Sequence, residues 1–236
     1  MRFLRGEHCV MSDILKRPAV AILLALAIAG IVLIESTRVV WAPFFYIAAL
    51  LTIVIPLAAR TAFSDAEHPK GRSLWVVMAL ALVGLLIVDV AATGPILDAV
   101  GKSLRITPLS AALTALIKKA AGQQHMSVDN ASMIYAAFYV VWAPFAEELF
   151  YRGYLRQSLK PQFGETATSV ISSLLFALRH VPHLIFLTVV PWTTIGIWAS
   201  CVFLGGLIFY WLVRQTGKLW PAMVVHFIGN VAGLLT

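Results

Sequence analysis

Charged residues are scarce in this chain. Asp, Glu, Lys and Arg together make up only 12% of its 236 residues, whereas hydrophobic residues make up 60%. Because an ordinary water-soluble domain carries about 25% charged residues, a soluble fold of this composition would expose too much apolar surface to water. The composition therefore predicts a helical membrane protein.

Cysteine is rarer still, with two residues in the whole chain. Cys9 lies in the polar N-terminal segment and Cys201 lies inside an apolar run. This placement argues against a disulfide framework and so against a disulfide-rich secreted scaffold. Cys201 is expected to serve as a packing residue.

Acidic residues are fewer than basic ones, 11 against 18, which gives a net charge of +7. The Lys and Arg residues lie mostly in the short segments between apolar runs. In such segments, positive charge orients a membrane protein and contacts anionic lipid headgroups. The charge therefore points to the lipid bilayer as a partner and not to nucleic acid.

Seven apolar runs come near the roughly 20 residues that an α-helix needs to cross a bilayer. They occupy residues 19–34, 39–59, 74–93, 131–150, 169–190, 193–213 and 221–235. Between the third and fourth runs, charges and Pro108 interrupt residues 96–121, which predicts one or two amphipathic surface helices or a re-entrant eighth element. We expect an all-α, polytopic transmembrane bundle of about seven to eight spans.

Basic residues are divided unevenly between the two ends of these spans. The N-terminal segment and segments 60–72, 152–160 and 214–218 hold 12 Lys and Arg residues, whereas the segments at the other end hold five. Since loops rich in Lys and Arg stay in the cytoplasm, the N-terminus is expected to be cytoplasmic. No signal-peptide cleavage site follows the first run, so we expect its helix to be retained.

Titratable side chains at membrane depth are costly, so each one is a candidate functional residue. Glu147 and Glu148 are adjacent and point about 100° apart on a helix, so they cannot share one role. Glu148 and Arg152 are four residues apart, which predicts an ion pair on one helix face. Glu147 is then left without a cationic partner and available as a general base. The alternative is that both glutamates mark the point where the helix leaves the membrane.

Two further pairs have helical spacing in the later apolar runs. Phe176 and His180 are four residues apart, and so are His226 and Asn230, so each pair occupies one helix face. A single histidine in a helix is more often structural than catalytic. Two histidines, an asparagine and a carboxylate would each need a separate buried partner, however, and one shared site satisfies all of them.

These residues form three short motifs: EExxxR from Glu147 to Arg152, FxxxH from Phe176 to His180, and HxxxN from His226 to Asn230. In this order they resemble the CPBP family, which contains CAAX prenyl endopeptidases of the Ras-converting-enzyme type, bacterial intramembrane proteases and bacteriocin-immunity proteins. The resemblance covers roughly residues 134–233. It implies an intramembrane endopeptidase whose catalytic core lies within residues 131–236, with residues 1–130 adding N-terminal helices and the amphipathic segment to one integrated membrane domain.

The resemblance also implies a role for each motif residue. Glu147 and His180 are expected to activate a water molecule, while His226 and Asn230 are expected to stabilise the oxyanion or hold the water. Three further residues occupy supporting positions: Glu148, Arg152 and Phe176. The implied setting is the bacterial inner (plasma) membrane, and the implied partner is a membrane-associated protein or peptide substrate.

Zinc is the open question about cofactors. Glu147, His180 and His226 are also residue types that catalytic zinc uses. The HExxH signature is absent, however, and the three residues would come from three separate helices, so we favour no cofactor. A non-catalytic immunity or scaffold protein is the other alternative, although no motif position is missing. A transporter is disfavoured because the sequence has no paired halves.

Overall fold

The computed structural model describes residues 11–38, 43–63, 73–93, 109–185 and 192–235, and the regular elements in these ranges are helical. The all-α prediction is confirmed. The α-helices are α2 (Pro18–Arg38), α3 (Pro43–Ala58), α4 (Leu74–Thr93), α6 (Leu109–Gln123), α7 (Val128–Ala136), α8 (Ala143–Glu147), α9 (Arg156–His180), α10 (Pro182–Ile185), α11 (Trp192–Thr216) and α12 (Trp220–Leu235). Two π-helical segments, η1 (Ala137–Trp142) and η2 (Glu148–Leu155), continue the helical run on either side of α8.

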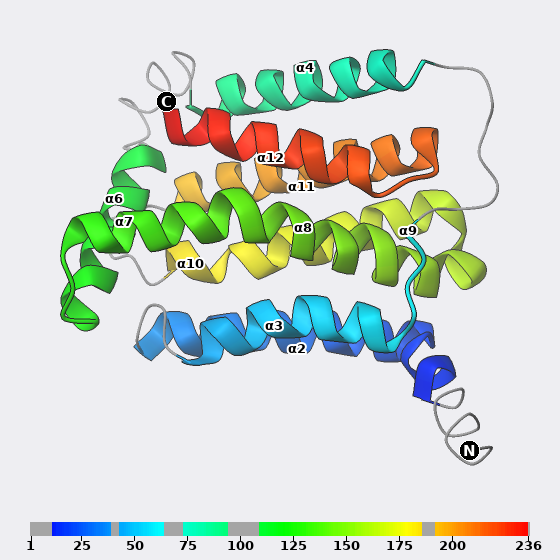
Figure 1. Ribbon diagram of the computed structural model, residues 1–236, viewed down its shortest axis with the longest axis horizontal. Helices are drawn as coiled ribbons and strands as arrows, with labels where there is room; N and C mark the ends of the chain where they lie inside the picture. Colours follow the sequence, from blue (N-terminus) through cyan, green and yellow to red (C-terminus); the bar gives the residue numbers. More distant parts are fainter. Residues whose placement is uncertain (1–10, 39–42, 64–72, 94–108, 186–191, 236) are drawn as a thin grey trace.

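The long helices lie side by side along one axis (Figure 1). The pair α2 and α3 lies on one side of the bundle and α4 on the other, with the run through α8, α9, α11 and α12 between them. The turn between α6 and α7 lies at one end. The start of α2, the end of α3 and the connection between α11 and α12 lie at the opposite end, so the bundle has two distinct ends.

Several of these helices are apolar enough for a membrane. Val128–His180 and Trp192–Thr216 are long and apolar enough to cross a bilayer, and four shorter apolar helical stretches accompany them. Large apolar side chains point outward from the bundle, among them Leu23, Trp75 and Trp192. These helices indicate an integral membrane protein. The number of spans stays a prediction, and residues 96–108 of the predicted amphipathic segment lie outside the described residues.

The long run Val128–His180 contains a sharp turn at Gly164. This glycine has a φ of 72° and a ψ of 174°, a conformation that residues with a Cβ avoid. The chain reverses here, and α9 then runs back along the helix that precedes it (Figure 1). The run is therefore two antiparallel helices joined at Gly164.

Two sequence-based expectations about this region are wrong. Residues 152–160 are helical and do not form a loop, and Arg152 and Arg156 are buried. The fourth apolar run was expected to end at residue 150, shortly after Glu147, but the helix continues for about 24 Å beyond Glu147 before Gly164. The physical reason is that both arginines have carboxylate partners inside the protein, so the helix need not end where the charges begin.

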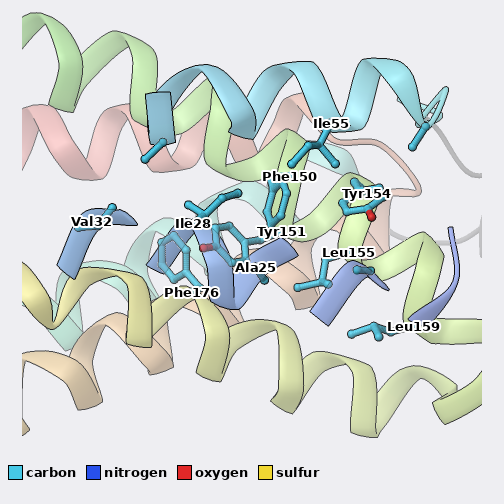
Figure 2. Close-up of a cluster of buried hydrophobic side chains, with 13 residues drawn as sticks. Ala25, Ile28, Val32, Ile55, Phe150, Tyr151, Tyr154, Leu155, Leu159 and Phe176 are labelled. Atoms are coloured by element: carbon cyan, nitrogen blue, oxygen red, sulfur yellow. The ribbon is translucent and has the colours of Figure 1, made fainter. Parts of the chain in front are cut away.

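A cluster of buried side chains packs α2 and α3 against η2 and α9 (Figure 2). Ala21, Ala25 and Ile28 of α2 are all buried and lie three or four residues apart, so they share one helix face. Small residues on that face allow close approach of the large rings of η2, such as Phe150 and Tyr151. The packing fixes η2, and with it the segment that carries the glutamates.

Polar contacts join the helices at the end of the bundle near Gly164. The Glu165 carboxylate accepts from Arg156 Nη2 at 2.8 Å, from Lys160 Nζ at 2.9 Å and from the Tyr210 hydroxyl at 2.5 Å. The Gln157 side-chain amide makes two hydrogen bonds to the backbone of Ala62, at 2.8 and 3.1 Å. These contacts hold the turn of α9 against α11 and the end of α3.

The two ends of the bundle give a test of the predicted cytoplasmic N-terminus. Gln162, beside the Gly164 turn, and His125, between α6 and α7, are both exposed and lie at opposite ends. In a chain without Cys9 and Cys201, a membrane-impermeant maleimide applied to intact cells should label His125→Cys and leave Gln162→Cys unlabelled. Both should react after permeabilisation. The reverse pattern in intact cells would contradict the orientation.

Candidate active site

The predicted ion pair between Glu148 and Arg152 is confirmed. Arg152 Nη1 lies 3.2 Å from Glu148 Oε1, and both side chains are fully buried. Arg152 Nη2 donates to the carbonyl of Gly206 in α11 at 3.1 Å, and its guanidinium lies 4.2 Å from the centre of the Phe176 ring in α9. Arg152 therefore ties η2 to both neighbouring helices.

His226 of α12 contacts the same carboxylate. Its Nδ1 lies 3.0 Å from Glu148 Oε1. A carboxylate accepts hydrogen bonds, so we assign the hydrogen to Nδ1. The ring stacks on Phe209 of α11, with 4.5 Å between ring centres and 21° between planes. Glu148 thus orients two site residues, Arg152 and His226.

Glu147 forms an ion pair with Arg179 of α9. The expectation that Glu147 has no cationic partner is therefore wrong. Both side chains are buried, with 9% of the Arg179 side chain and 3% of the Glu147 side chain exposed. The pairing follows from the turn at Gly164, which brings α9 back along α8. The signal in the sequence was Arg179 itself, since an arginine inside an apolar helix needs a buried partner.

The second oxygen of Glu147 faces His180. Glu147 Oε2 lies 3.7 Å from His180 Nε2, and it is buried without a hydrogen-bond partner among the described residues. His180 Nδ1 lies 2.7 Å from the carbonyl of Phe176, so Nδ1 carries the hydrogen and Nε2 of the neutral ring is an acceptor. Two acceptors that face each other cannot bond directly. A molecule with two hydrogens to donate, such as water, is suited to both.

Asn230 lies one turn after His226 on α12. Its side-chain amide donates to the carbonyl of Tyr139 at 2.6 Å. Tyr139 belongs to η1, and π-helical segments of this kind occur frequently at functional sites because they shift the backbone hydrogen-bond register. This bond holds α12 against the helix that carries Glu147.

The structure brings the three motifs to one place, around the ring of Phe176. The centre of this ring is 4.6 Å from that of His180 and 6.1 Å from that of His226. Glu147 faces His180 and Glu148 faces His226. Motif spacing did not predict the partners Gly206, Phe209 and Tyr139, because they contribute backbone carbonyls or a ring face from other helices.

The zinc alternative requires Glu147, His180 and His226 to converge on one point. In the described ranges, no three His, Cys, Asp or Glu side chains are grouped closely enough to hold a metal ion. His226 is directed to Glu148, and Arg179 occupies one oxygen of Glu147. These residues do not fit a zinc site in this arrangement.

Comparison with known proteins identifies a family. Residues 129–232 match the family model described as type II CAAX prenyl endopeptidase Rce1-like. The matched range contains every residue of the three motifs, and it confirms the resemblance that they carry. No curated protein and no solved structure matches the chain.

Gly206 offers a test of the packing around Arg152. A Cβ at Gly206 would lie 3.0 Å from the Cβ of Ser173 and 3.1 Å from Arg152 Nη2, whereas one at Gly205 would meet Leu85 at an ordinary 3.6 Å. Overpacking costs about 1 to 3 kcal/mol, so Gly206→Ala should lower the melting temperature of the purified protein and Gly205→Ala should not. Equal melting temperatures for the two variants would contradict this packing.

Proposed function

Residues 129–232 belong to the Rce1-like family of type II CAAX prenyl endopeptidases, and on this premise we propose that the protein is an intramembrane endopeptidase. It hydrolyses a peptide bond of a membrane-associated protein or peptide. The nucleophile is a water molecule activated by Glu147, and no resident metal takes part.

The observation that carries this mechanism is the pair of facing acceptors, Glu147 Oε2 and His180 Nε2. They are 3.7 Å apart, and Oε2 is a buried atom without a hydrogen-bond partner among the described residues. A water between them donates one hydrogen to each. As the water oxygen bonds to the scissile carbonyl carbon, its proton passes to Glu147. The C–N bond then breaks, and the same proton is delivered to the leaving amine.

The developing oxyanion needs hydrogen-bond donors, and we assign these to His226 and Asn230. The Asn230 amide has two hydrogens, of which one goes to Tyr139. His226 donates through Nδ1 to Glu148, and Nε2 is the second donor when the ring is in its imidazolium form. Donors held in place before the reaction stabilise the transition state without rearrangement.

Glu147 and Glu148 should respond differently to the same substitution. Glu147→Gln removes the base and keeps the shape, so cleavage per folded molecule should fall by about 10² to 10⁴-fold, and the loss of the charge partner of Arg179 should also lower the melting temperature. Glu148→Gln should lower the melting temperature, because Arg152 loses its charge partner in a buried site, a change that costs about 3 to 5 kcal/mol.

Membrane proteomes from cells with the wild-type protein or the Glu147→Gln variant would first identify a substrate, through protein termini that disappear with the variant. Cleavage of a peptide spanning that site then gives the rates for both glutamine variants. A near wild-type rate for Glu147→Gln would show that the glutamate mechanism is wrong.

Metal removal separates the proposed mechanism from its zinc alternative. After treatment with a strong chelator and verified loss of metal, cleavage of the same peptide should persist at the original rate. Loss of activity followed by recovery on addition of zinc alone would instead support a site built from Glu147, His180 and His226.

A further inference from the structure

Glu147 meets two adjacent residues of α9 through its two oxygens. Oε1 accepts a hydrogen bond from Arg179 Nη1, and Oε2 lies 3.7 Å from His180 Nε2. The two oxygens thus have different surroundings. Oε1 is bound to a guanidinium, and Oε2 is the oxygen that the proposed function assigns to water.

A glutamate does not keep such an orientation unaided. The last torsion of its side chain is broad and roughly two-fold, so the two oxygens readily exchange places. The planar guanidinium of arginine donates in fixed directions and therefore restrains a carboxylate more strongly than a lysine ammonium does. Arg152, whose charge also acts on Glu147, is directed to Glu148 and Gly206.

The Arg179 bond also leaves the reactive oxygen accessible. It goes to Oε1 and does not cover Oε2, so the ion pair need not break before water binds. Within the buried site, the guanidinium also balances the charge of a carboxylate that would be costly to bury unpaired. Both features suit a residue that prepares Glu147 for the reaction.

We propose that Arg179 is a positioning residue, which holds Oε1 of Glu147 so that Oε2 faces the attacking water and His180. The inference rests on the proposed function and goes beyond it, because Arg179 occupies a variable position of the FxxxH motif and has no role in the motif pattern. Arg179 does not contact the reacting atoms and acts through Glu147.

The test compares Arg179→Gln, Arg179→Lys and the control Arg214→Gln, an exposed arginine at the end of α11. Arg179→Gln should lower kcat by about 10- to 100-fold with little change in KM, since a misplaced catalytic group slows the chemical step. Arg179→Lys should recover most of the loss because it keeps the charge. Arg214→Gln should match the wild type in both constants.

A double variant with Glu147→Gln separates positioning from a structural role. If Arg179 acts only through Glu147, then adding Arg179→Gln to Glu147→Gln should slow single-turnover cleavage no further. The double variant should also accumulate better than either single variant, because each single change leaves one buried charge unpaired and the double change leaves none.

Three results would overturn the proposal: a wild-type kcat for Arg179→Gln, full additivity in the double variant, or a double variant that accumulates less than Glu147→Gln. The failure of the proposed function looks different. In that case Glu147→Gln itself cleaves at the wild-type rate. If Glu147→Gln is inactive and Arg179→Gln is fully active, only the Arg179 proposal is wrong.

Discussion

The buried ion pair between Glu148 and Arg152 is the contact on which the arrangement of the site depends. A charge placed in a low-dielectric interior must be paired and hydrogen-bonded, and these two side chains are fully buried. The pair also contacts three other helices, through Gly206 of α11, Phe176 of α9 and His226 of α12. The cost of burying the pair therefore fixes the positions of all the motif-bearing helices.

The adjacency of the two glutamates gives them separate partners. Adjacent residues point about 100° apart on a helix, so the side chains of Glu147 and Glu148 leave it in different directions. Glu147 faces Arg179 and His180 on α9, whereas Glu148 faces Arg152 and reaches α12. One carboxylate thus supports the framework, and the other faces His180 through the oxygen that the proposed function assigns to water. This division is what makes the proposed hydrolysis compatible with a stable membrane interior.

Helical spacing relates only residues that are close in the sequence, and this explains which contacts of the site were predictable. The Glu148–Arg152 pair was predicted correctly because a separation of four residues on a helix brings two side chains together whatever surrounds them. The Glu147–Arg179 pair spans 32 residues and the Asn230–Tyr139 bond spans 91. Neither follows from helical spacing, since both depend on how the helices pack after the chain reverses at Gly164.

The sequence by itself determined that the chain is helical and apolar, which three pairs of site residues lie four positions apart on a helix, and which family the three motifs resemble. These follow from composition and from contacts within one helix. Only the tertiary structure decided that Arg152 and Arg156 lie inside the protein, that Arg179 binds Glu147 and that His226 binds Glu148. The physical reason is that a buried charge takes the partner that packing brings within reach, and packing between distant helices is not encoded in local spacing.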